Sequence, residues 1–270
     1  MSVLLEIEDL TLRVPAVEIL RGISLQVATG ETVGLVGESG SGKSSTARAA
    51  LRLFPDEAQA GGRISVGGVD VLSAGDAAVQ RIRAHDAAMI FQAPRTALNP
   101  VRRIGDSATE RLVQVHGLDR KAARAKLLTL FEHVGLRDPE SLLRKYPHQL
   151  SGGMLQRVVI AAALSIDPKL LLADEATSAL DVTTQAEVLA LLKRLRGERD
   201  LGVLFITHDL HLAAAYCDRV YVMREGLIVD HQPGATIFEN PGNEYTRQLA
   251  DAVPTLPAQD STETGKVGSR

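Results

Sequence analysis

Cysteines, strongly basic runs and long apolar segments are all scarce in this sequence. The 270 residues include one cysteine, Cys217, which cannot form an internal disulfide or a cysteine-rich metal site and fits a reducing compartment. Lys and Arg total 30 against 33 Asp and Glu, which gives a formal net charge of −3, and no run of five basic residues occurs. Nucleic acid is therefore not an expected partner.

The sequence also lacks the patterns of a membrane span and of a secretory signal. Its longest apolar stretches, residues 158–164 and 170–173, are much shorter than the roughly 20 residues of a spanning helix. The N-terminal segment has no basic residues before Glu6, which comes too early for a signal peptide. We expect a soluble, intracellular protein.

The residues that are present are sufficient for a large core. Hydrophobic residues make up 45% of the chain and charged residues 23%, and the length suits one large α/β domain or a core with a subdomain. The last 17 residues, 254–270, are polar and have no apolar period, so we predict that this tail is disordered.

Short apolar runs alternate with helical patterns in the first and last thirds of the chain. Strands are predicted over residues 32–37, 63–66, 87–91, 169–173, 201–207, 219–223 and 227–230. Helices are predicted over residues 44–54, closed by Pro55, over 182–196 and around 210–216. Residues 97–164 have helical periodicity throughout, which indicates a helical subdomain inserted between strands. This order predicts an α/β fold whose parallel sheet is covered on both faces and binds ligands at the carboxyl ends of its strands.

A phosphate-binding pattern follows the first of these strands. Its residues are Gly37, Glu38, Ser39, Gly40, Ser41, Gly42, Lys43 and Ser44. The glycines allow backbone N–H groups to surround a β-phosphate, Lys43 reaches the β and γ oxygens, and Ser44 offers a hydroxyl to Mg²⁺. A chance glycine-rich turn is the alternative, but a strand before it and a helix after it favour nucleotide binding.

Two acidic residues, Asp174 and Glu175, end a second apolar strand. Beside a phosphate loop, Asp174 is expected to hold Mg²⁺ through water and Glu175 to act as the general base on the attacking water. Taken alone, such a pair is more often a helix cap or a solvated turn.

Residues 150–157 form a third motif, in which Ser151 is a predicted N-cap and the following helix buries one face. Gly152 and Gly153 leave the amides of the first turn open to an anion. The alternative is an ordinary cap on a core helix.

Residues 150–157 resemble the signature motif of ABC-type ATPases, and their combination with the phosphate loop and residues 170–175 is specific to that superfamily. The resemblance covers roughly residues 4–253. It implies a P-loop NTPase fold, an ABC-type nucleotide-binding domain with a parallel-sheet core, an antiparallel N-terminal β subdomain and an inserted helical subdomain. The implied divisions are an ATP-binding core over 1–92 and 168–253 and a helical subdomain over 93–167.

The resemblance also implies ATP and Mg²⁺ as cofactors and assigns the site residues. The implied catalytic residues are Lys43, Gln92, Glu175 and His208, and the implied metal ligands are Ser44, Gln92 and Asp174. The implied nucleotide contacts are the phosphate loop from Gly37 to Ser44 with Ser45, then Val14, Ser151, Gly152, Gly153, Gln156 and Asp181. Gln92 matches the Q-loop glutamine, residues 178–181 match the D-loop, and His208 matches the switch histidine.

Two positions depart from the family pattern. Val14 stands where an aromatic side chain usually stacks on adenine, so the base would be held by apolar packing without a π-face. Ala176 stands where importers usually have proline. The first departure leaves the base specificity open, and the second weakens the argument for import from this motif.

The family resemblance implies a head-to-tail pair of ATPases. Each ATP would lie between the phosphate loop of one subunit and Ser151, Gly152 and Gly153 of the other, with Asp181 near the seam. A related but distinct second ATP-binding subunit is expected as the partner, and a homodimer is the alternative.

Residues 91–100, 146–150 and 244–249 resemble the corresponding stretches of peptide/nickel importer ATPases. They imply an ATPase that powers the import of di- or oligopeptides, with nickel or a metal chelate as the alternative cargo. The expected partners are two transmembrane permease subunits and an extracytoplasmic solute-binding protein, and the expected location is the cytoplasmic face of the cell membrane.

Two other functional classes remain as alternatives. A soluble, non-transport ABC ATPase acting on ribosomes or DNA would bring tandem cassettes, a coiled coil or a basic face, none of which is visible in the sequence. A nucleotide-sensing regulatory subunit is disfavoured because Glu175 and His208 are both present.

Overall fold

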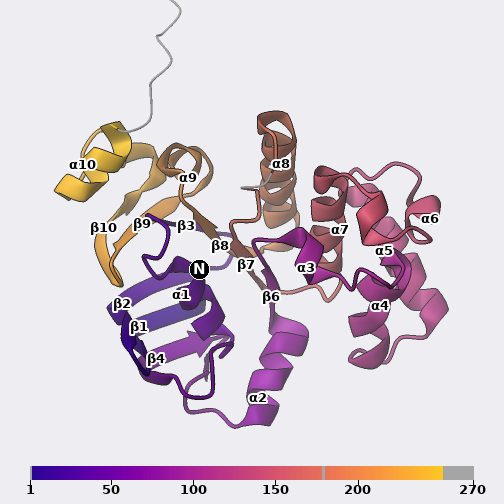
Figure 1. Cartoon of the computed structure of the whole chain (residues 1–270), viewed down its shortest axis with the longest axis horizontal. Coiled ribbons are helices and arrows are strands. Elements are labelled where there is room, and N and C mark those ends of the chain that lie inside the picture. The colour runs from indigo at the N-terminus through magenta and orange to yellow at the C-terminus, as the bar shows by residue number, and fades with distance from the viewer. Residues whose placement is uncertain (1, 178–179, 252–270) are drawn as a thin grey trace, which may run out of the picture.

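The computed structural model describes residues 2–177 and 180–251, which form two sheets and a group of helices (Figure 1). The predicted disordered tail, 254–270, lies outside the described residues. The six-stranded sheet has the order β10-β9-β3-β8-β7-β6, in which only β10 runs antiparallel to its neighbour. Its strands are β3 (Thr32–Val36), β6 (Ala87–Ile90), β7 (Leu170–Asp174), β8 (Gly202–Thr207), β9 (Arg219–Arg224) and β10 (Leu227–Pro233).

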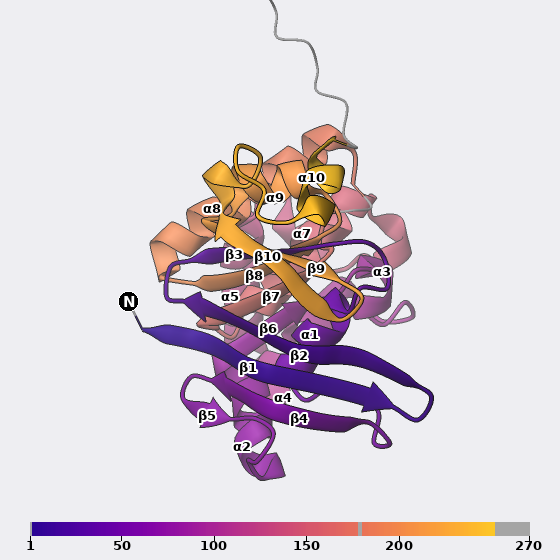
Figure 2. The same ribbon diagram turned by 90° about the vertical axis from the view of Figure 1, so that its left-hand side faces the viewer.

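The second sheet is antiparallel and has the order β2-β1-β4-β5. Its strands are β1 (Val3–Val14), β2 (Val17–Ala28), β4 (Gln59–Val66) and β5 (Val69–Asp70). Figure 2 shows β1, β2 and β4 side by side below β9 and β10. The structure thus confirms a parallel core with an antiparallel N-terminal sheet.

Helices cover the core and form a separate group between β6 and β7. Those that accompany the sheets are α1 (Lys43–Ala50), α2 (Asp76–Arg81), a π-helical turn (Ile82–Asp86), α8 (Val182–Arg199), α9 (Leu210–Tyr216), a 3-10 turn (Gly234–Thr236) and α10 (Glu244–Asp251). The inserted group contains α3 (Pro94–Ala97), α4 (Ile104–Gln114), α5 (Arg120–His133), α6 (Pro139–Leu142), a 3-10 turn (Pro147–Gln149) and α7 (Gly152–Leu164). The insertion lies where the sequence predicts it, and the domain boundaries at residues 92, 167 and 253 stay predictions.

The six-stranded sheet buries both of its faces. Along β7, Leu170 and Leu172 belong to the apolar cluster that includes α1 and the antiparallel sheet, whereas Leu171 and Ala173 belong to the cluster that includes α7 and α8. All five residues of this strand are buried. This explains the uninterrupted apolar runs in the sequence, because each face of a doubly covered strand needs apolar side chains.

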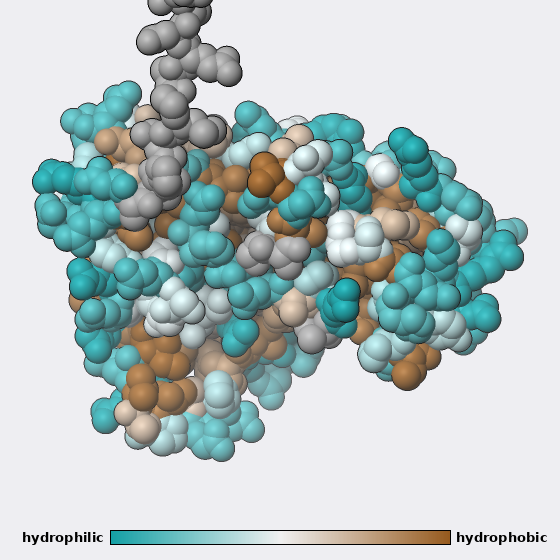
Figure 3. All heavy atoms as spheres, turned by 45° about the horizontal axis from the view of Figure 1, so that its top comes forward, coloured by the Kyte–Doolittle hydropathy of each residue, from teal (hydrophilic) through white to brown (hydrophobic). Residues whose placement is uncertain are grey.

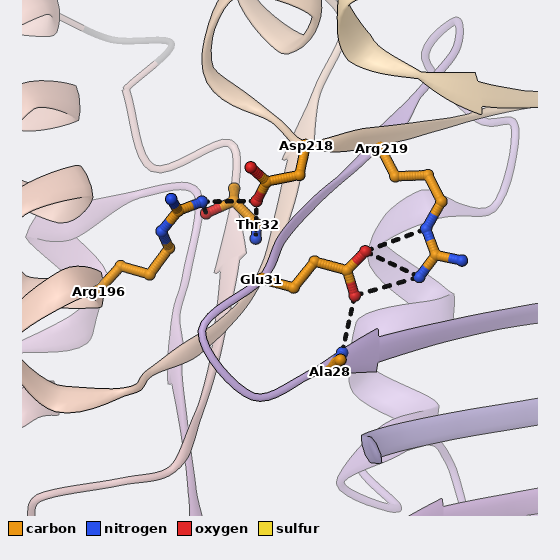
Figure 4. Close-up of polar contacts among 6 residues, drawn as sticks. All are labelled: Ala28, Glu31, Thr32, Arg196, Asp218 and Arg219. Carbon is orange, nitrogen blue, oxygen red and sulfur yellow. Dashed lines mark hydrogen bonds and ion pairs between the residues drawn. The ribbon is translucent and has the colours of Figure 1, made fainter. Parts of the chain in front are cut away.

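Two ion-pair groups brace the end of β3 that is remote from the phosphate loop (Figure 4). Glu31 accepts a hydrogen bond from the Ala28 N–H at 2.8 Å and pairs with Arg219, with a closest approach of 2.9 Å. Asp218 accepts from the Thr32 N–H at 2.8 Å and pairs with Arg196 of α8. Together these contacts tie the β2–β3 turn to the start of β9 and the end of α8.

The predicted helix over residues 44–54 is wrong at its C-terminal end, because α1 stops at Ala50. The chain turns at Arg52, whose φ is 50°. The Arg83 guanidinium donates hydrogen bonds to the carbonyl oxygens of Leu51 and Arg52 at 2.8 and 2.7 Å. The helix therefore ends in a left-handed turn and not at Pro55: the Leu53 N–H donates to the Arg48 carbonyl oxygen at 2.8 Å, and the Arg52 N–H donates to that of Ala49 at 2.9 Å.

Polar side chains cover most of the face shown in Figure 3, with smaller apolar areas between them. Within residues 2–177 and 180–251, no helix is both long enough and apolar enough to cross a membrane.

Candidate active site

The phosphate loop connects β3 to α1 and begins where β9 approaches it. A side chain at Gly37 would place its Cβ 2.0 Å from the Met223 carbonyl oxygen, so this position requires glycine. Gly42 is the N-cap of α1, with a φ of 109° that other residues rarely adopt. The loop therefore presents the N-terminus of α1 at the carboxyl end of the parallel sheet.

Lys43, the first residue of α1, lies folded back into this loop with 5% of its surface exposed. Its Nζ donates to the carbonyl oxygens of Gly37 and Glu38, each at 2.7 Å. Burial lowers the pKa of the ammonium group, an effect opposed by the carboxylates of Glu175, Asp174 and Glu38. Because neutral carbonyls hold this cation, an incoming polyphosphate offers it a stronger, charge-assisted partner.

Ser44 and Asp174 join the loop to the end of β7. The Ser44 Oγ donates to the Asp174 Oδ1 at 2.7 Å. Asp174 is 1% exposed, burial raises the pKa of its carboxyl group, and its Oδ2 has no hydrogen-bond partner among the described residues. A hydroxyl beside a carboxylate with a spare oxygen is a donor set that fits Mg²⁺.

Glu175, Gln92 and His208 meet just beyond the carboxyl ends of three adjacent strands, β7, β6 and β8. The Gln92 Nε2 donates to the Glu175 Oε2 at 2.7 Å, and the His208 Nδ1 lies 3.7 Å from the Glu175 Oε1. Glu175 has a left-handed backbone with a φ of 45°, and its N–H donates to the Ile206 carbonyl oxygen at 3.0 Å. The parallel register thus brings together an amide, a carboxylate and an imidazole that are far apart in the sequence.

The signature residues Ser151, Gly152 and Gly153 lie at the N-terminus of α7. The Ser151 Oγ accepts from the Met154 N–H at 3.3 Å, as a predicted N-cap of α7 should. Gly153 packs against α8, since a Cβ there would lie 2.6 Å from the Thr184 Cγ2. Figure 1 shows α1 on one side of β6, β7 and β8 and α7 on the other.

Two further predicted site residues accompany α7 and α8. Gln156 is 1% exposed within α7, and its Nε2 has no hydrogen-bond partner in the described part of the chain. Asp181 caps α8 by accepting from the Thr184 N–H at 3.0 Å. Ser178 and Ala179 of the predicted D-loop lie outside the described residues.

The structure also shows neighbours of the phosphate loop that sequence reasoning missed. Val14 ends β1 opposite Val17, whereas the strand contact to the loop comes from Leu20, whose Cδ2 would lie 2.8 Å from a Cβ at Gly42. The Gly226 N–H donates to the Ser41 carbonyl oxygen at 2.9 Å. No local sequence pattern marks Leu20 or Gly226 as loop contacts.

These groups can bind a triphosphate and activate a water molecule. The helix amides and the buried ammonium suit the anion, and the hydroxyl and carboxylate oxygens suit a cation. A second carboxylate, with an imidazole near it, can act on the water. A phosphate loop and an inserted helical group that carries a second glycine motif define the ATP-binding cassette class.

The family model described as "ABC transporter" matches residues 20–178, and the chain belongs to this family. It is 41% identical over 266 residues to the oligopeptide transport ATP-binding protein OppD of Bacillus subtilis (strain 168), covering 96% of this chain and 74% of that protein. The dipeptide transport ATP-binding protein DppD of the same organism is 43% identical over 242 residues, covering 89% and 72%. OppD of Mycobacterium tuberculosis is 43% identical over 268 residues, but the chain spans only 44% of its length.

Solved structures agree with the fold. The structure of cbiO1 from Clostridium perfringens, part of the ABC transporter complex cbiONQ, superposes with a TM-score of 0.76 at 25% identity and covers 94% of this chain and 97% of that one. A dimeric, post-hydrolysis cassette, MJ0796 bound to ADP and Pi, gives a TM-score of 0.74 at 25% identity and covers 85% and 98%. The chain is thus an ABC-type ATPase domain that binds and hydrolyses ATP, and the predicted family and fold are confirmed.

Proposed function

We propose that this chain is the ATP-hydrolysing subunit of an ABC importer for dipeptides or oligopeptides. The observation that carries the proposal is the 41–43% identity to ATP-binding proteins of oligopeptide and dipeptide transport over 89–97% of the chain. The three short stretches that resemble peptide/nickel importer ATPases support membership of this importer group without separating the two cargoes. Such a subunit works at the cytoplasmic face of the cell membrane.

In the proposed reaction, the loop amides and Lys43 bind the β- and γ-phosphates. Glu175 takes the proton of the attacking water, Gln92 orients that water, and His208 donates a hydrogen bond to the γ-phosphate. The 2.7 Å contact between Gln92 and Glu175 supports this division of roles, because it holds the carboxylate beside the amide. Positioning and electrostatics then account for most of the rate enhancement.

Ser44 and Asp174, with Gln92, are the residues that would hold Mg²⁺. Their support is the buried Ser44–Asp174 contact and the spare Asp174 oxygen described above. When bound, the ion neutralises charge on the β- and γ-phosphates.

A second ATP-binding subunit completes each site in this proposal. The phosphate loop and the signature residues Ser151, Gly152 and Gly153 lie on opposite sides of the parallel strands, so the signature of a partner must supply the missing face of the nucleotide. The dimeric structure of the MJ0796 cassette supports this arrangement.

A groove between the core and the inserted helices is the proposed dock for a permease subunit. This cavity of about 630 Å³ is lined by residues of β6, α4 and the π-helical turn, and by Phe91, which precedes Gln92 in the sequence. Its lining includes the exposed apolar residues Phe91 and Val115. Arg83 and Arg111 also line it, and burial lowers the pKa of both guanidinium groups. Such a lining suits an apolar helix that carries an acidic residue.

The cargo is tested by uptake in the host. Cells whose only copy of this chain carries Glu175→Gln are compared with wild-type cells for the uptake of a labelled dipeptide, a labelled tetrapeptide and ⁶³Ni²⁺. We expect peptide uptake to fall to background and nickel uptake to stay at the wild-type level. Normal peptide uptake together with lost nickel uptake would contradict the proposal and favour a metal importer.

A further inference from the structure

A tyrosine near the end of the described chain contacts the phosphate loop. Tyr245, on α10, accepts a hydrogen bond from the Glu38 N–H, with 3.3 Å between the nitrogen and the phenolic oxygen. Tyr245 is 5% exposed, and 207 positions separate it from Glu38 in the sequence. This contact brings α10 directly to the edge of the nucleotide site.

The ring of Tyr245 is held by its surroundings. The Arg224 guanidinium lies 4.8 Å above the ring centroid, a cation–π distance. Burial raises the pKa of the Tyr245 hydroxyl, and the nearby Glu38 carboxylate acts in the same direction. The phenol is therefore neutral at physiological pH and offers a fixed oxygen to the Glu38 N–H.

The Glu38 residue is consequently held at both of its backbone polar groups. Tyr245 accepts from its N–H, and the Lys43 Nζ donates to its carbonyl oxygen at 2.7 Å. The Ser41 N–H also donates to this carbonyl oxygen, at 3.2 Å. A triphosphate competes for the Lys43 ammonium, so nucleotide binding removes the charged donor of the carbonyl and leaves the Ser41 hydrogen bond. The hold on the N–H does not involve the phosphates and persists.

We propose that Tyr245 is a positioning residue for the nucleoside triphosphate: its hydroxyl keeps the Glu38 end of the phosphate loop in the binding conformation while Lys43 moves to the phosphates. Preorganising the loop lowers the ordering cost of binding, so Tyr245 acts on nucleotide affinity. It touches neither the water nor the γ-phosphate in this scheme, which rests on the phosphate-loop roles under the proposed function.

The test is Tyr245→Phe in the full chain, because phenylalanine keeps the ring, the Arg224 contact and the burial. Tyr221→Phe is the matched control: Tyr221 is 6% exposed, and the Arg219 guanidinium lies 5.6 Å from its ring centroid. Binding of the non-hydrolysable analogue AMP-PNP with Mg²⁺ is measured by titration calorimetry, the thermal midpoint by scanning calorimetry, and kcat and KM by phosphate release.

Loss of one hydrogen bond should raise the Kd for AMP-PNP and the KM for ATP by about three- to tenfold. The kcat of Tyr245→Phe should match the wild type, and its thermal midpoint should fall by no more than the roughly 2–4 °C that one hydrogen bond contributes. Tyr221→Phe should match the wild type in every measurement. An unchanged Kd, or an equal rise in both variants, would overturn the proposal, because Tyr245 would then only pack. A wild-type chain that binds AMP-PNP but fails to support peptide uptake would contradict the proposed function without touching this inference, since the Kd comparison needs neither hydrolysis nor transport.

Discussion

The buried Asp174 carboxylate lowers the stability of the folded protein and has a proposed role in ligand binding. It is 1% exposed, and only one of its oxygens has a hydrogen-bond partner among the described residues. Burying a charge without full compensation is unfavourable. Under the proposed role of Asp174 as a Mg²⁺ ligand, the nucleotide-free protein carries a cost that ligand binding would offset.

Replacing this carboxylate by an amide should therefore stabilise the nucleotide-free protein. Asp174→Asn keeps an acceptor for Ser44, and we expect its thermal midpoint at pH 7 to rise by roughly 2–4 °C, the effect of about 1 kcal/mol in a domain of this size. Burial raises the folded pKa of Asp174 above the unfolded value. The stability that proton uptake contributes is thus complete below the unfolded pKa and is lost as the pH rises through the folded pKa.

The gain in Asp174→Asn should accordingly be largest near neutrality and vanish as the pH falls well below the unfolded pKa of about 3.9, where the wild-type carboxyl is protonated in both states. Scanning calorimetry across this range checks the trend, with the exposed Asp56→Asn as the control. Stabilisation by ATP and Mg²⁺ should be smaller in Asp174→Asn than in the wild type. A lower thermal midpoint at pH 7 would show that the charge is already compensated in the protein.

At this scale the sequence reveals candidate site residues where each has a local pattern. Lys43 and Ser44 follow glycines that a phosphate loop requires, and Asp174 ends an apolar strand. The structure places Ser44 and Asp174 in contact, and their roles stay predictions. The contact of Tyr245 with Glu38 could not be predicted, because nothing local relates two residues that meet only through the packing of α10.

At the scale of elements, the N-termini of α7 and α8 pack tightly through Gly153 and Thr184. A Cβ on Gly153 would lie 2.6 Å from the Thr184 Cγ2. Thr184 cannot turn away freely, because its Oγ1 donates to the Asp181 Oδ2 at 2.7 Å. The signature motif at the start of α7 therefore packs directly against the capped first turn of α8.

This contact predicts a steric effect with a specific rescue. Gly153→Ala should lower the thermal midpoint by a few degrees, since overpacking costs about 1–3 kcal/mol. Thr184→Ser removes the obstructing methyl group but keeps the hydroxyl, so the double variant should regain most of the loss. Gly152→Ala is the matched control, because a Cβ at Gly152 meets nothing within 4 Å. Equal midpoints for wild type and Gly153→Ala in calorimetry would contradict this account of the packing.

Some helices and strands can be predicted from the sequence and others cannot. Strands β3, β7 and β8 are found because burial on both faces makes them continuous apolar runs. β1 and β2 are 12 residues each, but several register shifts interrupt their pairing and hence their alternation, so no clean period of two marks them. The sequence does not predict the end of α1, because the left-handed residue that closes it is Arg52 and not a glycine.

For the whole molecule, the proposed function implies that one chain holds two half-sites. The phosphate loop lies at the start of α1, whereas the signature residues begin α7 across the parallel strands. Sequence motifs reveal both halves, because each has its own local pattern. They do not reveal the separation, which follows only from the order of the strands and the place of the inserted helices.

The most direct test is a disulfide across the proposed seam between two copies of this chain, the homodimer that the family resemblance allows as the alternative pairing. In the Glu175→Gln chain, cysteines replace the exposed Ser39 of the phosphate loop and the exposed Ser151 of the signature, while the native Cys217 is buried, with a pKa raised to about 12, and does not compete. Under mild oxidation with ATP and Mg²⁺, we predict a covalent dimer on non-reducing gels that is absent without ATP and absent when Lys43→Ala is added. A bond formed within one chain, or a dimer that forms equally well without ATP, would contradict the account.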